Sequence, residues 1–520
     1  MTIFKMVPLS VALLFSCAAS AGDPAPQKDP APEYAPSWES LMQYDCPEWF
    51  RDAKFGIWAH WGPQSVPEMG DWYARFLYGP QPGDSEWRTK GAIAAHAYHV
   101  EHYGHPSVFG YKDIIPLFKA ENWDPKKLMK LYYDAGARYF VSMGQHHDNF
   151  DLWDSKHQPW NSVNMGPHRD IVREWQEAAR ENGMKFGVSF HGFTAWGWFE
   201  CSRGCDTEGP LKGVPYDGNM TKEDGKGKWW EGYDPQDLYC RPHPNGAPRD
   251  DAFKQNYIDR LYDLFENYHP DLIYFDGGIP FDSLRIASTY YNRNTAWNNG
   301  SNQGVIAIKG ASVKKQKAIV LDIENGQSDY LRPYPWQTDT SFDGWFVRKG
   351  YNPPSTKQII QQLVDIVSKN GNLLLNIAQY SDGTISDKAL WFLKCMAEWM
   401  QINGEAIHGS RPWEIYGEGP VHVTDGEQNK SQRLSYTAQD IRFTRNADNL
   451  YAFILSTPGQ EVLIKSLPKG KELWFGEIQS IRLLGNDEPL EWKQTREGLK
   501  VIMPKSLRGK YVFTLKISGK

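Results

Sequence analysis

The stretch Pro270-Asp-Leu-Ile-Tyr-Phe-Asp-Gly-Gly-Ile-Pro280 lies near the middle of the 520-residue chain and gives the first indication of its fold. Four apolar residues, Leu272–Phe275, follow a helical pattern and end at a single carboxylate, Asp276. Two glycines, Gly277 and Gly278, come next and leave room for a ligand. This arrangement is typical of a buried barrel strand that delivers one acid into a cleft. The alternative is an aspartate that caps a strand-to-helix turn.

Short apolar runs alternate with amphipathic helices between residues 37 and 412, which predicts a parallel sheet. Besides the run that ends at Asp276, the predicted strands cover residues 54–60, 138–143, 185–190, 318–323 and 373–377. The predicted helices cover residues 124–134, 171–181, 252–268 and 356–368. This many units in one domain favours an α/β fold of the (β/α)8-like TIM barrel type. Short alternating runs with turn residues between them predict a small antiparallel β-sandwich over residues 413–520.

Polar side chains occupy the C-terminal ends of the predicted strands. They are His60, His146, His147, Asp148, His191, Asp276 and Glu324. In a barrel all of these ends open onto one face, where active sites are built. A single histidine at such a place is more often a core residue than a ligand, but polar groups at five strand ends predict a site.

Several motifs resemble those of glycoside hydrolase family 29, the α-L-fucosidases. They are Trp49–Ile57 with His60-Trp61-Gly62 and Asp71-Trp72-Tyr73, Ala135–Phe140, His146–Phe150, Leu152–Lys156, Pro270–Gly277, Val367–Asn376 and Asn403–Ile407. The motifs occur in family order over roughly residues 45 to 415. The resemblance implies a barrel followed by a β-sandwich, and a retaining hydrolysis that releases α-linked L-fucose from an oligosaccharide or polysaccharide.

The resemblance also implies roles for the matching positions. Asp276 takes the position of the nucleophile, and the residues expected to contact the sugar are His60, Asp71, Trp72, His146, His147, His191 and Trp336. Asp71 stands where the family usually has glutamate, and its shorter side chain reaches less far. Independently of the family, neutral imidazoles and an indole N–H suit a deoxy sugar, because they bind hydroxyls without imposing charge.

The second carboxyl group departs from the family pattern. Many relatives have the acid/base in a Trp-Glu pair, whereas this chain has Trp336-Gln337, and glutamine cannot donate a proton usefully. We expect Glu324 to take this role, because it follows the predicted strand after Asp276 and precedes the turn residues Asn325-Gly326. The alternative is that Glu324 is a surface residue in a loop, in which case Asp339 is the candidate proton donor.

The N-terminus predicts export from the cytoplasm. Lys5 precedes an apolar stretch over residues 7–15, and Ala19-Ser20-Ala21 suits signal peptidase, which predicts a signal peptide over residues 1–21. A Pro- and Ala-rich flexible leader follows over residues 22–36. The protein is therefore expected to be secreted or periplasmic, with lipoprotein anchoring at Cys17 as the alternative. No later segment is long and apolar enough to predict an integral membrane span.

Composition limits the class of partner. The net charge is −6 and there is no long basic run, which argues against nucleic acid. The 22 Trp and 27 Tyr residues favour carbohydrate, because aromatic rings stack on sugars. Residues 203–249 predict a long barrel-face loop, in which Lys212, Lys226 or Lys228 would recognise a sulfated glycan, and Cys201, Cys205 and Cys240 nearby could pair locally.

Three function classes stay open. The first is an exo-acting α-L-fucosidase or a close relative such as an α-L-galactosidase, without cofactor or metal. The second is a glycan-binding protein that has lost catalysis, which Gln337 makes conceivable. The third is a metal-dependent hydrolase built on His146, His147, Asp148 and Asp276, disfavoured because adjacent histidines in a strand point to opposite faces.

Overall fold

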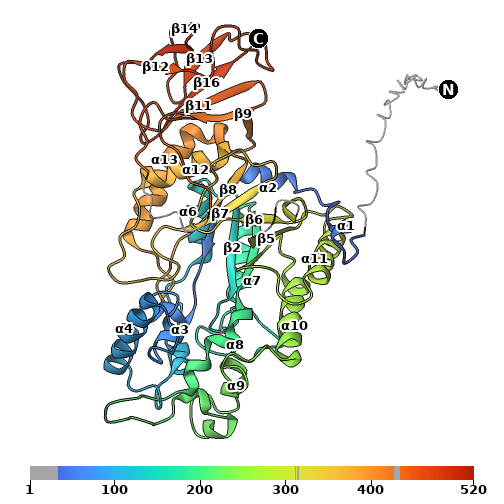
Figure 1. The fold of residues 1–520 in the computed structure, drawn as a ribbon, viewed down its shortest axis with the longest axis vertical. Coiled ribbons are helices and arrows are strands. Elements are labelled where there is room, and N and C mark those ends of the chain that lie inside the picture. Colours follow the sequence, from blue (N-terminus) through green and yellow to red (C-terminus); the bar gives the residue numbers. More distant parts are fainter. Residues whose placement is uncertain (1–32, 311, 313–314, 427–433, 520) are drawn as a thin grey trace, which may run out of the picture.

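The computed structural model describes residues 33–310, 312, 315–426 and 434–519 (Figure 1). The predicted signal peptide, Cys17 and most of the predicted leader lie outside these residues. Eight parallel strands close into a barrel in chain order, as the sequence predicts. They are β1 (Phe55–Ala59), β2 (Tyr139–Gln145), β3 (Lys185–Phe190), β4 (Leu272–Phe275), β5 (Val305–Lys309), β6 (Val320–Asp322), β7 (Trp336–Ser341) and β8 (Gly371–Asn376).

Two of these strands, β5 and β7, are absent from the sequence-based prediction. β5 is an apolar run that periodicity alone does not distinguish from a segment of a buried helix. β7 is polar, because Gln337 and Asp339 point inward and bond to other polar side chains of the barrel. Glu324 therefore follows β6, the second strand after Asp276, and not the next one as expected.

Helices cover the outside of the barrel and occur in several of its connections. They are α1 (Trp38–Leu41), α2 (Glu48–Ala53), α3 (Tyr73–Phe76), α4 (Glu86–His102), α5 (Tyr111–Ile114), α6 (Pro125–Asp134), α7 (Ile171–Glu181), α8 (Ala195–Trp198), α9 (Pro235–Leu238), α10 (Asp251–Tyr268), α11 (Ser283–Trp297), α12 (Thr356–Ser368) and α13 (Asp387–Ile407). Local sequence starts several of them: Asp124 caps α6 through the N–H of Lys127, and Ser355 forms a capping box with Gln358 at α12. Since helices cover one face of the sheet and side chains fill the barrel, β2 and β8 are buried at every position.

Two antiparallel sheets follow the barrel. The five-stranded sheet has the order β13-β16-β11-β10-β9 and the three-stranded sheet the order β12-β15-β14. Their strands are β9 (Arg411–Glu418), β10 (Ile441–Asn446), β11 (Asn449–Ile454), β12 (Glu461–Ile464), β13 (Ser480–Leu483), β14 (Trp492–Gln494), β15 (Leu499–Ile502) and β16 (Phe513–Ser518). Residues of both sheets, such as Ile441 and Val501, share one core. Arg442 of β10 donates to Asp365 of α12 at 2.6 Å, which fixes the sandwich to the barrel helices.

The predicted loop over residues 203–249 forms most of the connection from β3 to α10 and contains short helical turns and α9. In Figure 1, α3, α4, α8 and α9 lie at the end of the molecule opposite the C-terminal sheets. The cysteines among the described residues are all unpaired, so the local pairing of Cys201, Cys205 and Cys240 is wrong. Cys201 instead donates to the carbonyl of Trp198. No helix in the described part of the chain is long and apolar enough to cross a membrane.

Candidate active site

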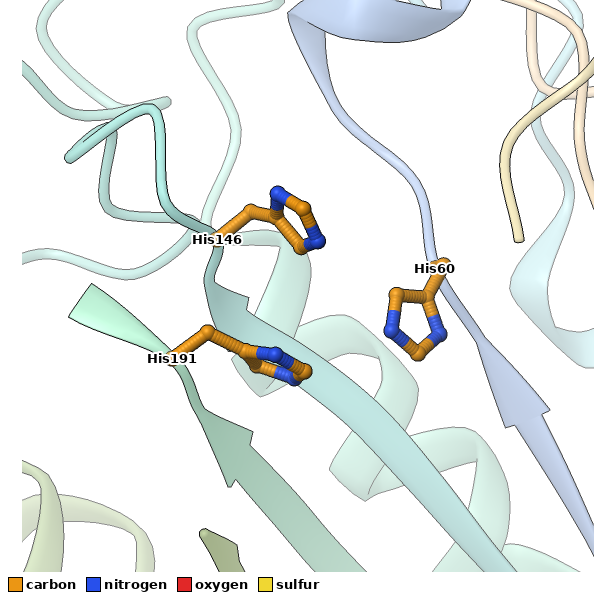
Figure 2. A group of neighbouring side chains, drawn as sticks. All are labelled: His60, His146 and His191. Atoms are coloured by element: carbon orange, nitrogen blue, oxygen red, sulfur yellow. The ribbon is translucent and has the colours of Figure 1, made fainter. Parts of the chain in front are cut away.

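Three histidines from neighbouring strands meet at the C-terminal face of the barrel (Figure 2). His60 follows β1, His146 follows β2, and His191 follows β3. Their ring centroids lie 5.8 Å apart for His60 and His146, 5.2 Å for His60 and His191, and 5.1 Å for His146 and His191. The rings point into one common space, and all three residues are less than 5% exposed. The parallel register of the strands thus brings together histidines that are far apart in sequence.

His147 and Asp276 complete this cluster. Nε2 of His147 and Nδ1 of His191 each lie 3.4 Å from Oδ2 of Asp276. The rings of His146 and His147 are 4.4 Å apart, so the expectation that they face opposite sides is wrong. Both residues lie beyond the last residue of β2, where the alternation of a strand no longer applies.

Lys309 connects the two predicted catalytic carboxylates. It is the last residue of β5, and its ammonium group contacts Asp276 and lies 2.7 Å from Oε2 of Glu324. Two hydrogen-bond lengths of about 3 Å limit the separation of the bonded carboxylate oxygens to roughly 6 Å. The sequence reasoning missed Lys309, although a charged residue at the end of an apolar run is the same signal that identified Asp276.

The ammonium and the histidines determine the charge of Asp276. Burial raises the pKa of this carboxyl group, but the hydrogen bonds from His147 and His191 and the charge of Lys309 outweigh burial. The pKa of Asp276 therefore lies well below its usual range, and the group is a carboxylate at neutral pH. The Lys309 pKa is raised, because Asp339, Asp276 and Glu324 outweigh the effect of burial.

The three histidines of Figure 2 are uncharged. Burial is the main cause that lowers the pKa of His60, His146 and His191 below the usual value, and the neighbouring histidines and Lys309 contribute. Neutral imidazoles can both donate and accept hydrogen bonds. The cluster therefore provides a polar pocket without net positive charge from these rings, next to a carboxylate.

Asp71 and Trp72 lie at the edge of the same cluster. The ring centroid of Trp72 is 4.4 Å from that of Trp198, and the ring centroid of Trp198 is 4.7 Å from that of His147. Burial raises the pKa of Asp71, and the charges that act on this carboxyl include those of His147 and Glu324. The structure thus brings these two predicted site residues together with the histidines.

Trp336 does not belong to this site. It is the first residue of β7, pairs in register with the first residue of β8, and donates from Nε1 to the carbonyl of Lys369 at 2.8 Å. Its side chain is completely buried at the N-terminal end of the barrel, so the expectation of a sugar contact is corrected. Gln337 is likewise buried and donates to Asp322 at 2.7 Å.

Asp339, the alternative proton donor, lies inside the barrel. It is 1% exposed and accepts a hydrogen bond from the hydroxyl of Tyr274 at 3.0 Å. By contrast, the side chain of Glu324 is 21% exposed, close to that of Asp276 at 22%. The side chain of Glu324 is therefore more accessible than that of Asp339.

Among the residues that the structure describes, two groups of side chains have the spacing of metal ligands. They are His60, His146 and His191, and His147, His191 and Asp276. The second group shares Asp276 with the ammonium of Lys309, which repels a cation. In the first group, Nδ1 of His146 forms a hydrogen bond with Gln64, so this nitrogen is not available to bind a metal ion. Asp148, a ligand of the metal hypothesis, instead bonds to the hydroxyl of Tyr111.

Comparisons with known proteins identify related chains. The family model described as "Alpha-L-fucosidase" matches residues 24–405, and that described as "Alpha-L-fucosidase C-terminal domain" matches residues 433–518. Tissue alpha-L-fucosidase of Rattus norvegicus is 28% identical, over 98% of this chain and 97% of its own length. Plasma alpha-L-fucosidase of Homo sapiens is 27% identical, over 91% and 89%. The structure of the Thermotoga maritima alpha-fucosidase in complex with fucose has a TM-score of 0.66 and 27% identity, over 93% of this chain and 100% of that chain.

Proposed function

The chain belongs to the α-L-fucosidase family, and we propose that it is an exo-acting enzyme that hydrolyses terminal α-L-fucosyl residues of glycans with retention of configuration. One observation carries the proposal most directly. Asp276 and Glu324 contact the same ammonium group of Lys309, beside a pocket of buried, uncharged histidines. A retaining glycosidase needs two carboxyl groups about 5 to 5.5 Å apart, and this geometry is compatible with that spacing.

The proposed reaction has two steps. In the first, the carboxylate of Asp276 attacks the anomeric carbon while Glu324 gives its proton to the leaving oxygen. In the second, Glu324 takes a proton from water, which attacks the same carbon and releases Asp276. Formation of the ester removes the charge of Asp276, so the Lys309 ammonium then stabilises the Glu324 carboxylate, the form that acts as base.

The sugar is proposed to bind through imidazole rings and an indole N–H. His60, His146, His147 and Trp72 provide hydrogen bonds for its hydroxyls, and aromatic rings cover its methyl group. The ring centroid of Trp345 lies 4.9 Å from that of His60, and the ring centroid of Phe346 lies 5.3 Å from that of His146. Phe55, Trp58 and Phe275 are at most 1% exposed and belong to the core, so they are not proposed to contact the methyl group.

The N-terminal sequence supports export of the enzyme. The charged start, the apolar stretch over residues 7–15 and the small residues 19–21 form the pattern of a signal peptide. We therefore propose that the substrate is a fucosylated oligosaccharide or polysaccharide met outside the cytoplasm.

Hydrolysis of aryl α-L-fucoside by the purified protein tests this function. The account predicts release of L-fucose, with the α-anomer formed first in a time-resolved ¹H NMR experiment and an unchanged rate in a chelator. Aryl α-L-galactoside should react more slowly, because an apolar pocket disfavours its extra hydroxyl. It should still react measurably, because that discrimination is worth only about 1 to 3 kcal/mol. No release of fucose would indicate a binding protein, and loss of activity in the chelator would indicate a metal-dependent hydrolase.

The Lys309→Met variant should shift the pH dependence of the reaction. Loss of the ammonium raises the pKa of Asp276, which must be ionised to attack, so activity is lost at a higher pH as the solution is acidified. The acidic limb of the kcat/KM profile should therefore move upward in pH, while Lys309→Arg, which keeps the charge, should retain the wild-type limb. Acidic limbs that superimpose in all three proteins would show that Lys309 does not control the charge of Asp276.

A further inference from the structure

Gln64 contacts His146 and is completely buried. It lies in the short 3-10 helix η1 (Pro63–Ser65), which follows β1. Its side-chain oxygen accepts a hydrogen bond from the backbone N–H of Ala74 at 3.1 Å, and its Nε2 lies 3.0 Å from Nδ1 of His146. One amide group thus joins the segment after β1, the helix α3 and the end of β2.

The backbone N–H of Ala74 determines which way this amide faces. A backbone N–H can only donate, so it must meet the amide oxygen, and the NH₂ group of Gln64 must face His146. Nδ1 of His146 then accepts a hydrogen bond and carries no proton. In the neutral ring the proton lies on Nε2, so His146 presents an N–H donor.

Asn376 determines which nitrogen of the His60 ring carries the proton, and the result is the opposite tautomer to that of His146. Oδ1 of Asn376 accepts from the backbone N–H of His60 at 2.8 Å and lies 3.2 Å from Nδ1 of the same ring. Nδ2 of Asn376 donates to the carbonyls of Gly344 and Trp345, so this amide cannot be reversed. Nδ1 of His60 therefore carries the proton, and its Nε2 is an acceptor.

We propose that Gln64 is a positioning residue that holds His146 as a hydrogen-bond donor toward the substrate, facing the acceptor His60. A hydroxyl group can donate and accept, so neighbouring sugar hydroxyls bind between the two rings in one direction only. Figure 2 shows the rings of His60 and His146 pointing into the same space. The inference rests on the proposed function for the identity of the ligand, but the proton positions follow from the hydrogen bonds alone.

The Gln64→Glu variant tests this role with little change in size. A carboxylate accepts from both neighbours, which moves the His146 proton to Nδ1 and leaves a lone pair facing the sugar. The inhibition constant for L-fucose should rise about 10- to 100-fold near pH 8.5, as expected for a buried polar group without its partner. Toward acid pH the introduced carboxylate and His146 together bind one more proton, because the carboxylate raises the pKa of the adjacent ring; Nε2 then carries a proton again, and the loss should shrink.

The other ionisable groups that face His146 require a control. They are His60, His147, His191 and Asp276. These groups are the same in wild type and in Gln64→Met, which keeps the size of the side chain but has no polar atoms. Gln64→Met should bind L-fucose more weakly by a factor that does not shrink toward acid pH, so the difference between the two variants isolates His146.

A spectrum of the wild-type protein provides a readout that does not depend on activity. In protein labelled with ¹⁵N-histidine, the nitrogen resonances of His146, assigned by their loss in His146→Asn, should show a proton on Nε2 and none on Nδ1. A proton on Nδ1 in wild type, or equal weakening of Gln64→Glu near pH 8.5 and at acid pH, would overturn the proposal. If L-fucose does not bind, the proposed function fails, while the wild-type spectrum still decides the role of Gln64.

Discussion

Replacing Asp276 with alanine is expected to lower kcat for aryl α-L-fucoside by about 10⁴-fold or more, because removal of a nucleophile leaves only substrate binding and transition-state stabilisation. Asp276 directly follows β4 and meets His147, His191 and Lys309 at hydrogen-bonding or ion-pairing distance. These partners keep it ionised and hold its position. KM should change much less than kcat, because the histidines that are proposed to bind the sugar remain.

Azide distinguishes loss of the nucleophile from loss of the fold. In Asp276→Ala, azide can enter the space that the carboxylate leaves and attack the anomeric carbon directly, which gives a β-fucosyl azide. Asp276→Asn fills that space and should be rescued poorly. Asp251→Ala, at a fully exposed carboxylate on α10, serves as the matched control and should keep the wild-type rate. Near-normal turnover of Asp276→Ala would contradict the assignment.

The Glu324→Ala variant should separate the two steps of the reaction. An activated aryl leaving group needs no proton, so the first step stays fast, while the second step slows because no base activates water. The variant should show a burst followed by a low steady rate, and azide should restore turnover with formation of an α-fucosyl azide. Natural glycans need protonation of the leaving group and should lose about 10²-fold to 10⁴-fold in rate.

Asp339→Asn is the comparison variant for Glu324. Asp339 is almost completely buried and bonds to Tyr274, so we expect its change to affect stability more than the rate of proton transfer. The burst kinetics and azide rescue of Glu324→Ala should therefore have no counterpart in Asp339→Asn. If Glu324→Ala kept wild-type rates on a natural fucoside while Asp339→Asn lost them, Asp339 would be the proton donor.

The sequence predicted the histidines and Asp276 because their physical signal is local. An apolar run that stops at a polar residue marks the end of a buried strand, and a barrel brings such ends together. His60, His146, His191 and Asp276 were found in this way. Lys309 has the same signal, but periodicity alone does not identify the apolar run that it ends as a strand. Gln64 has no signal of its own, because its role depends on a contact with His146, 82 residues away.

Trp336 shows where this reasoning fails. A motif gives the position of a residue in the chain but not the end of the strand on which it lies. Because β7 is polar inside the barrel, no apolar run marks its start, and the motif alone predicts Trp336 at the wrong face. The sandwich was predicted from alternation alone, whereas the buried ion pair of Asp365 and Arg442 that fixes it to α12 could not be read from the sequence.

Trapping of the covalent intermediate tests the central claim most directly. A 2-deoxy-2-fluoro-α-L-fucosyl fluoride has a reactive leaving group, and its fluorine at C2 destabilises the positively charged transition states, so the glycosyl-enzyme accumulates. After proteolysis, mass spectrometry should find one fluorofucosyl group per chain on the peptide with Asp276, bound through its carboxylate, and none in Asp276→Ala. A label on a different residue, or turnover that never yields a covalent adduct and releases β-L-fucose first, would contradict the account.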